Sequence, residues 1–224
     1  KKNIESTDAR AIIVSAGNAN VFTGKAGFDA VKNIVSKTAS SLNLSKREVL
    51  IAQTGVIGEP LDYVKIIKCI SNLTKSQKVD NWLAGAKAIM TTDTFPKHYS
   101  LSFKVGNKKV NITGIAKGSG MIAPNMATML SFISTDLNIS KNILQKLLQE
   151  ISEETFNSIT VDGDTSTSDT VILSATGKAE NKQVTNQICE EYSSFKTALF
   201  SVCKYLAMQI VRDGEGASKL ITIA

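Results

Sequence analysis

Cysteine, histidine, proline and aromatic residues are all scarce in this sequence, and each scarcity excludes a class of protein. The 224 residues include three cysteines, one histidine and three prolines, and only 6% are aromatic. Three cysteines far apart in the chain make neither a disulfide framework nor a zinc ligand set, and a single histidine cannot build a histidine-rich metal site. We therefore expect buried free thiols, a reducing compartment and no metal.

Long apolar runs and dense basic runs are also missing. No stretch of 18 or more apolar residues and no signal peptide occurs, which predicts a soluble, cytoplasmic protein that does not span a membrane. The formal charge is +6, but the lysines are scattered and not interleaved with aromatic residues. This pattern argues against nucleic acid as a partner, although a basic surface weakly attracts anionic metabolites.

The sequence does contain enough apolar material, 42% of its residues, for a real core. Its length allows one large domain or two small ones. Helical and strand patterns alternate, which predicts an α/β fold of mixed α+β layers, with helices packed on mixed sheets. We expect strands at 11–15, 49–52, 129–133, 171–175 and 220–224, helices at 25–42, 61–73, 82–90, 137–156 and within 183–211, and a hairpin of 99–105 with 110–115.

One stretch, residues 117–130 with the sequence KGSGMIAPNMATML, is unlike the rest of the chain. It is uncharged after Lys117, its glycines allow tight turns, and Pro124 breaks any helix begun upstream. Thr128 then stands before a predicted strand. A threonine hydroxyl becomes a nucleophile when a base lies beside it, and the threonine's own α-amine serves once the Ala127–Thr128 bond is broken. From spacing alone, a buried loop leading into a core strand is the favoured interpretation.

The 117–130 stretch resembles the self-cleavage segment of the bifunctional ornithine acetyltransferase / N-acetylglutamate synthase family of arginine biosynthesis. Four more stretches resemble the family in the same order along the chain: 17–20 with 23–24, 53–58, 91–97 and 155–170. The resemblance implies an N-terminal-nucleophile-like, ornithine acetyltransferase type fold. It also implies autocatalytic cleavage between Ala127 and Thr128.

The resemblance further predicts how the chain is divided. Cleavage would leave an α part, residues 1–127, and a β part, residues 128–224. Family members are longer at both ends, so we expect a partial chain whose β part is incomplete at its C-terminus. The α and β pieces of such a precursor are expected to assemble into a heterotetramer.

The catalytic residues implied by the resemblance are Thr128 as the nucleophile and Thr54 with Gly55 as the oxyanion hole. Backbone donors at a glycine-containing turn after a strand suit an oxyanion hole. Without the family, residues 53–58 are a plain strand-to-helix connection, and this interpretation stays open.

The substrate-binding residues implied by the resemblance are Thr94, Lys117, Thr128 and Glu215. Lys117 would face a substrate carboxylate, and Glu215 would pair with the ornithine amine. The residues by themselves also allow a helix-ending turn at 91–97, a surface lysine at the end of the hairpin, and an ordinary acidic loop at 213–219.

The acidic stretch 155–170 invites a calcium-binding interpretation through Asp162, Asp164 and Asp169. Its glycine, at position 163, comes too early for an EF-hand loop, and no glutamate closes the loop. The family resemblance instead implies a structured segment near the active site, whose hydroxyls and carboxylates bond local backbone, with no catalytic role.

The implied activity is that of a glutamate N-acetyltransferase. An acetyl group would move from N-acetylornithine to glutamate by a ping-pong mechanism through an acetyl-threonine ester. No metal or organic cofactor is implied, and some family members also accept acetyl-CoA as the donor. Two alternatives remain: a self-cleaving N-terminal-nucleophile amidase or aminopeptidase, and an inactive fragment that acts as an assembly partner.

Overall fold

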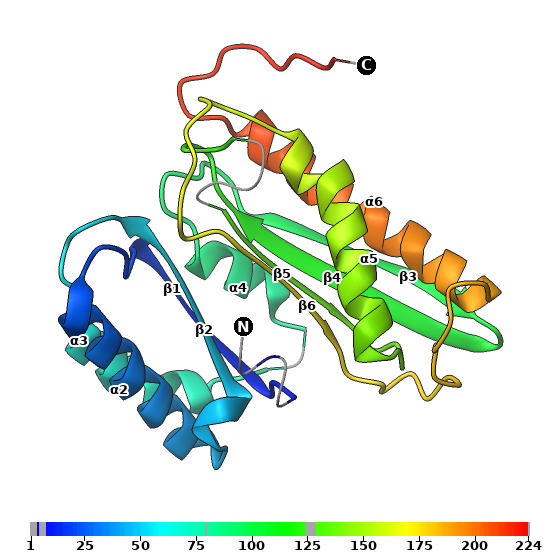
Figure 1. Ribbon diagram of the computed structural model, residues 1–224, viewed down its shortest axis with the longest axis horizontal. Coiled ribbons are helices and arrows are strands. Elements are labelled where there is room, and N and C mark those ends of the chain that lie inside the picture. The colour runs from blue at the N-terminus through cyan, green and yellow to red at the C-terminus, as the bar shows by residue number, and fades with distance from the viewer. Residues whose placement is uncertain (1–3, 5–7, 79, 124–128, 224) are drawn as a thin grey trace. The chain divides into compact units, whose positions relative to one another are not determined.

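The structure is a computed structural model that describes residues 4, 8–78, 80–123 and 129–223. The chain forms two compact units, Lys1–Asn81 and Trp82–Ala224, and each unit has its own sheet (Figure 1). The expected α/β class, with helices packed on mixed sheets, is confirmed. None of the helices in the described ranges is long and apolar enough to cross a membrane.

The first unit is a short parallel sheet with two helices. Its elements are β1 (Ala11–Asn18), α2 (Gly24–Leu42), η1 (Lys46–Glu48), β2 (Val49–Val56) and α3 (Tyr63–Lys75). β1 and β2 pair in register from Ala11↔Val49 to Asn18↔Val56. Parallel strands need a crossover connection, which α2 supplies as it packs against β2, and α3 lies beside α2 (Figure 1). Both strands therefore end at the same edge of the sheet.

The loop after β1 is hydrogen-bonded to the first turn of α2. The Thr23 hydroxyl donates to Asn20 Oδ1 at 2.8 Å, and Asn20 Nδ2 donates to the Gly27 carbonyl at 2.8 Å. A Cβ at Gly27 would lie only 1.9 Å from Thr23 Oγ1, so glycine is needed for this close approach. Asn20 thus has a structural task that turn and capping chemistry explains.

The second unit contains a four-stranded mixed sheet and three α-helices. Its elements are α4 (Trp82–Ala88), β3 (Lys97–Val105), β4 (Lys108–Lys117), β5 (Leu130–Thr135), α5 (Lys141–Glu154), η2 (Phe156–Ser158), β6 (Thr170–Ala175) and α6 (Glu190–Arg212). The strand order is β3-β4-β5-β6, antiparallel except for the parallel pair β5-β6. The expected hairpin is confirmed: Gly106, at φ +59°, and Asn107 join β3 to β4, as a type II′ turn with glycine at its first central position allows.

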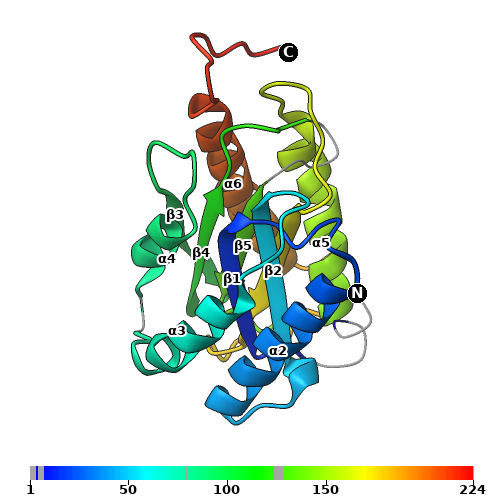
Figure 2. The same cartoon turned by 90° about the vertical axis from the view of Figure 1, so that its left-hand side faces the viewer.

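The core of the second unit lies between its sheet and the helices α5 and α6, while α4 covers the opposite face (Figure 2). Successive residues of β4 show this division. A Cβ at Gly114 would lie 2.9 Å from both Leu206 and Val202 of α6, whereas Ile115 points to Gly85 of α4. Gly114 therefore lets α6 approach the sheet closely.

The sequence expectations for α5, α6 and residues 220–224 differ from the structure. α5 begins at Lys141, not at residue 137, with Ser140 at its N-cap as predicted from the sequence. α6 begins at Glu190, because the Asn186 side chain accepts from the N–H groups of residues 188 and 189 and holds 183–189 outside the helix. The expected strand at 220–224 is wrong for residues 220–223, since a strand needs a pairing partner and none lies in the described part of the chain.

The expectation of buried thiols holds for one cysteine and is wrong for another. Cys203 is fully buried on α6, Cys189 is partly buried, and Cys69 is exposed on α3. The only buried residue of α3 is Ile70, so the apolar pattern of this helix did not predict which positions lie inside.

Candidate functional site

The predicted cleavage point lies, along the sequence, between two adjacent strands of the second unit, β4 and β5. Ala127 and Thr128 lie outside the described residues. Lys117 ends β4 and pairs directly with Leu130, which begins β5. The chain thus leaves the sheet and returns to it at the same place, and the sheet spans the expected boundary between residues 1–127 and 128–224.

A buried ionic cluster lies beside this exit point. Lys97 Nζ contacts Asp93 Oδ1 and Asp213 Oδ2, each at 2.6 Å. All three side chains are at most 2% exposed. Burial raises the pKa of Asp93, but the Gly118 N–H and the Lys97 ammonium outweigh it, so the pKa lies below its usual value. Asp93 is therefore ionised and binds the backbone directly after Lys117, since Gly118 N donates to its Oδ1 at 2.7 Å.

Lys117 lies against this cluster without forming an ion pair of its own among the described residues. Its Nζ donates to the Thr91 hydroxyl at 2.8 Å, and its side chain is buried. Burial lowers the pKa of Lys117, the Asp93 charge opposes that change, and Asp169 opposes it further. A protonated lysine has three donors, and only the Thr91 hydroxyl accepts from Lys117 among the described residues, so an acceptor such as a carboxylate can bind the remaining donors.

Glu215 and Thr94 come to the same region through bonds that join distant parts of the chain. The Thr94 N–H and hydroxyl both donate to Asp213, two residues before Glu215. The Glu215 N–H donates to the Ser119 carbonyl at 2.7 Å, and a Cβ at Gly120 would lie 2.6 Å from Glu215 Oε2. The structure thus brings Thr94, Lys117 and Glu215 into one cluster of loops.

Thr91 is the polar neighbour of Lys117 that sequence reasoning missed. Thr94 was expected to contact substrate, but its hydroxyl donates to Asp213. The Thr91 hydroxyl instead accepts from Lys117 in the loop cluster. Sequence reasoning also missed Asp93 and Lys97, and with them the bond from Lys97 to Asp213, 116 residues away. The spacing of Asp93 and Lys97 in the family-like stretch was the one local signal.

The acidic stretch 155–170 binds the backbone on both sides of residues 124–128, which include the predicted cleavage point. Asp162 accepts from the N–H groups of Met121 and Ile122, and Asp169 accepts from Met129 N at 2.7 Å. The expected bonding of carboxylates to backbone is confirmed, although most of that backbone is about 40 residues away and not local.

The predicted oxyanion residues lie at the end of β2 in the first unit. Thr54 is fully buried, and its Oγ1 has no hydrogen-bond partner among the described residues. Gly55 has φ +135°, and a Cβ there would lie 2.3 Å from the Gly17 carbonyl carbon. Buried polar atoms are normally satisfied, so Thr54 has hydrogen-bonding capacity that this unit's described residues do not use.

Asn18 and Gln53 share this property with Thr54. Asn18 Oδ1 and Gln53 Nε2 are also buried without a partner in the described ranges. All three residues stand near the carboxyl ends of β1 and β2, the edge at which ligands commonly bind in α/β sheets.

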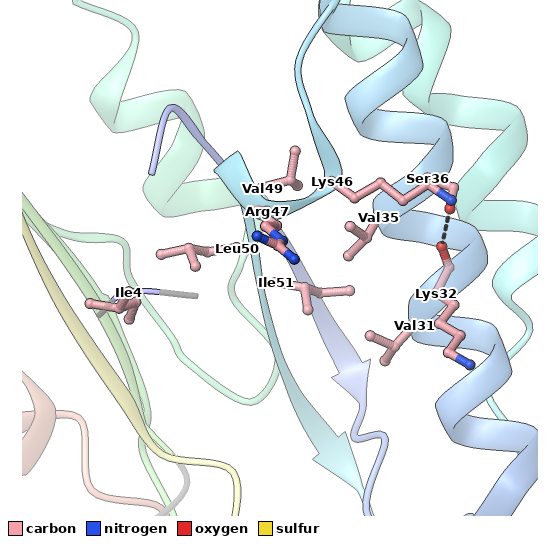
Figure 3. A pocket seen from close by; sticks show the side chains of 10 residues that line it. All are labelled: Ile4, Val31, Lys32, Val35, Ser36, Lys46, Arg47, Val49, Leu50 and Ile51. Atoms are coloured by element: carbon pink, nitrogen blue, oxygen red, sulfur yellow. Dashed lines mark hydrogen bonds between the residues drawn. The ribbon is translucent and has the colours of Figure 1, made fainter. Parts of the chain in front are cut away.

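A separate groove in the first unit holds none of the predicted site residues. It lies between α2 and β2, and Figure 3 shows aliphatic side chains with Lys32, Lys46 and Arg47 around it. No group of three or more histidine, cysteine or acidic side chains in the described ranges is arranged to hold a metal ion.

Comparisons with known proteins identify the family to which this chain belongs. The sequence model described as "ArgJ family" matches residues 1–224. "Arginine biosynthesis bifunctional protein ArgJ" of Bartonella henselae is 49% identical over 215 residues, which are 96% of this chain and 52% of that protein. The protein of the same name from Rhizobium meliloti is 49% identical over 226 residues, covering 100% of this chain and 55% of its own length.

Two solved structures are also similar to this chain. The ArgJ protein of Bacillus halodurans is 38% identical, with a TM-score of 0.45 over 52% of this chain and 61% of that one. The ornithine acetyltransferase of Mycobacterium tuberculosis, complexed with ornithine, is 26% identical, with a TM-score of 0.46 over 55% and 66% of the two chains. The chain spans about half the length of the curated relatives it matches. Since the family match extends over all 224 residues and these relatives are nearly half identical across it, the chain belongs to the ArgJ family.

Proposed function

We propose that this protein is a glutamate N-acetyltransferase that takes the acetyl group from N-acetylornithine after cleaving itself between Ala127 and Thr128. Membership of the ArgJ family and the 117–130 stretch support the proposal. So does the name of the relatives, which are called arginine biosynthesis bifunctional proteins.

The observation that carries the proposal is the pair of opposite charges around residues 118–120. The Lys117 ammonium lies at one end of this short stretch, and the Glu215 side chain lies against Gly120. An amino acid carries both a carboxylate and an ammonium group, so a lysine at one end of this stretch and a glutamate at the other match it in charge. We assign Lys117 to the carboxylate of the substrate and Glu215 to the ornithine amine.

Thr91 and Thr94 have different tasks in this proposal. Thr91 bonds Lys117 directly, so we place it beside the carboxylate of the substrate. Thr94 is exposed and donates to Asp213, and its oxygen keeps a lone pair that a substrate amine can use.

The proposed reaction has two acyl-transfer steps. The Thr128 hydroxyl attacks the acetyl carbonyl of N-acetylornithine, its proton passes to the Thr128 α-amine, and ornithine leaves with a proton as the ester forms. The glutamate amine then attacks that ester and regenerates the hydroxyl. Thr54 and Gly55 would stabilise the negative oxygen of both tetrahedral intermediates, a task suited to the unused hydroxyl of Thr54.

We propose no metal or organic cofactor for this reaction, with acetyl-CoA as an alternative acetyl donor. The proposed partners are the amino-acid substrates and the α and β pieces of the same precursor, assembled as a heterotetramer. We propose the cytoplasm as the compartment, which suits the free thiols of this chain.

Mass spectrometry of the wild-type chain and Thr128→Ala, with and without N-acetylornithine, tests the proposal. We expect the wild type to separate into two pieces and the β piece to gain one acetyl group. Thr128→Ala should stay intact and remain unmodified. An intact, unacetylated wild-type chain would instead favour the inactive assembly partner.

Product analysis separates transferase from hydrolase. With N-acetylornithine and glutamate present, the proposal predicts N-acetylglutamate and ornithine in equal amounts. Acetate release without N-acetylglutamate would assign the protein to the amidases. Replacing N-acetylornithine by acetyl-CoA shows whether the second donor is used.

A further inference from the structure

Residues 160–170 of the acidic stretch hold the backbone on both sides of the predicted cleavage site. On the upstream side, Asp162 accepts from Met121 N and, at 3.0 Å, from Ile122 N. The Ile122 carbonyl in turn accepts from Val161 N at 2.8 Å and from the Thr160 hydroxyl at 3.0 Å. Ile122 is thus bonded to this loop through both of its backbone polar groups.

The downstream side is held in the same way. Met129 N donates to Asp169 Oδ1 at 2.7 Å, and the Met129 carbonyl accepts from Thr170 N at 3.2 Å. Met129 N is the peptide nitrogen that joins Met129 to Thr128. The two bonds also align Leu130 with Thr170, the first residue pair of the β5-β6 ladder.

We propose that Asp169 is a positioning residue for self-cleavage, whose carboxylate fixes the backbone immediately after the bond that is cut. An intramolecular attack on the preceding carbonyl depends steeply on the alignment of the reacting groups. A carboxylate binds an N–H roughly twice as strongly as a neutral acceptor, so the ionised form of Asp169 holds Met129 better than the protonated form.

The surroundings of Asp169 make this bond sensitive to pH. Its Oδ2 is buried and accepts no hydrogen bond from the described residues. Burial raises the pKa of Asp169 to about 7, while Met129 N–H and the Lys117 ammonium oppose the rise. Lys117 is the charged side chain, among the described residues, that shifts the pKa of Asp169. The charges of Asp93 and Lys97 in turn shift the pKa of Lys117. Asp169 therefore changes its charge within the physiological range.

Other groups also make self-cleavage depend on pH. The Thr128 nitrogen is an amide in the intact precursor, but it becomes a free amine with a pKa of roughly 7.7–8.0 once its hydroxyl has attacked and an ester has formed. Wild type and Asp169→Asn share this dependence, so the ratio of their cleavage rates isolates the titration of Asp169. This inference depends on the proposed self-cleavage, and the experiment below separates the two.

Pulse-labelled precursor, made by cell-free translation of the full-length chain, is transferred to buffers between pH 6 and pH 8, and cleavage is followed on gels. Asp169→Asn keeps an acceptor for Met129 N–H but loses the charge, and Asp169→Ala loses both. We expect wild type to cleave fastest and Asp169→Ala slowest. The ratio of wild-type to Asp169→Asn rates should rise by up to about tenfold from pH 6 to pH 8, as the ionised fraction of a group with a pKa of about 7 does.

Asp164→Asn is the matched control, since Asp164 is exposed on the same loop and its backbone N–H, not its carboxylate, enters the network. It should cleave as wild type does. A wild-type rate in Asp169→Ala, or a wild-type to Asp169→Asn ratio that does not change with pH, would overturn the role of Asp169 alone. A wild-type chain that never cleaves would overturn the proposed function with it. The Asp169→Asn comparison remains decisive if Asp169→Ala does not fold.

Discussion

Replacing Lys97 by methionine tests whether the buried ionic cluster stabilises the second unit. The change removes the shared partner of Asp93 and Asp213 and leaves two carboxylates buried close together. At an effective dielectric constant of about 20, each 2.6 Å contact carries roughly 6 kcal/mol of gross Coulomb attraction. Most of this is offset by desolvation, and breaking a buried pair typically costs about 3–5 kcal/mol. We expect a loss of that size in the free energy of unfolding.

The exposed pair Lys196–Glu150 supplies the matched control. Its side chains are 39% and 43% exposed, so water screens the attraction. Lys196→Met should change the free energy of unfolding by no more than about 1 kcal/mol. Urea unfolding of wild type, Lys97→Met and Lys196→Met at pH 7 measures both values. Equal costs for the two substitutions would refute the reasoning from burial.

The pH dependence of the Lys97→Met deficit gives a second check. In the wild type the pKa of Asp93 is lowered, so its ionisation contributes stability that is present above its unfolded pKa and is lost as pH falls through the folded pKa. Without Lys97, burial and the neighbouring Asp213 raise the pKa of Asp93 and its charge becomes destabilising. The deficit should therefore be largest near neutral pH and shrink towards pH 4. A deficit that is constant over this range would contradict the assignment of charge to Asp93.

Three further expectations concern other parts of the chain. Gly55→Ala should lower the free energy of unfolding in urea by about 2 kcal/mol or more, because the new Cβ would lie 2.3 Å from the Gly17 carbonyl carbon at φ +135°. In the folded protein a thiol reagent should modify Cys69 but not Cys203, whose burial raises its pKa to about 12. Lys117→Met should leave the fold intact by circular dichroism but reduce kcat/KM for acetyl transfer about tenfold or more, since hydrogen bonds to charged groups contribute roughly 1.5–3 kcal/mol.

Local sequence patterns predicted most elements because their causes are local. The turn at Gly106 and Asn107 needs only a residue that accepts a positive φ between two alternating runs. α2 follows from apolar residues at helical spacing on one face. The expected strand at 220–224 failed since an apolar run specifies a strand only where another strand pairs with it.

The loop cluster could be predicted only in part, because long-range bonds assemble it. The family resemblance named Lys117 and Glu215, but nothing local places Glu215 against Gly120. That contact depends on Asp213, which binds Thr94 and Lys97 more than a hundred residues earlier in the chain. Thr91 was overlooked for the same reason, since its importance comes from its contact with Lys117 across 26 residues.

Charge balance explains how Lys117 can be buried and still be available to a ligand. Lys97 and Lys117 together carry two positive charges, and Asp93 and Asp213 carry two negative ones, so the four side chains are formally neutral. Lys97 contacts both carboxylates directly. Lys117 interacts with the charge of Asp93 at longer range, and its ammonium donates only to Thr91 among the described residues. A carboxylate that reaches Lys117 would therefore find an ammonium already desolvated and held in place, which is the condition under which a single charged contact discriminates strongly between substrates.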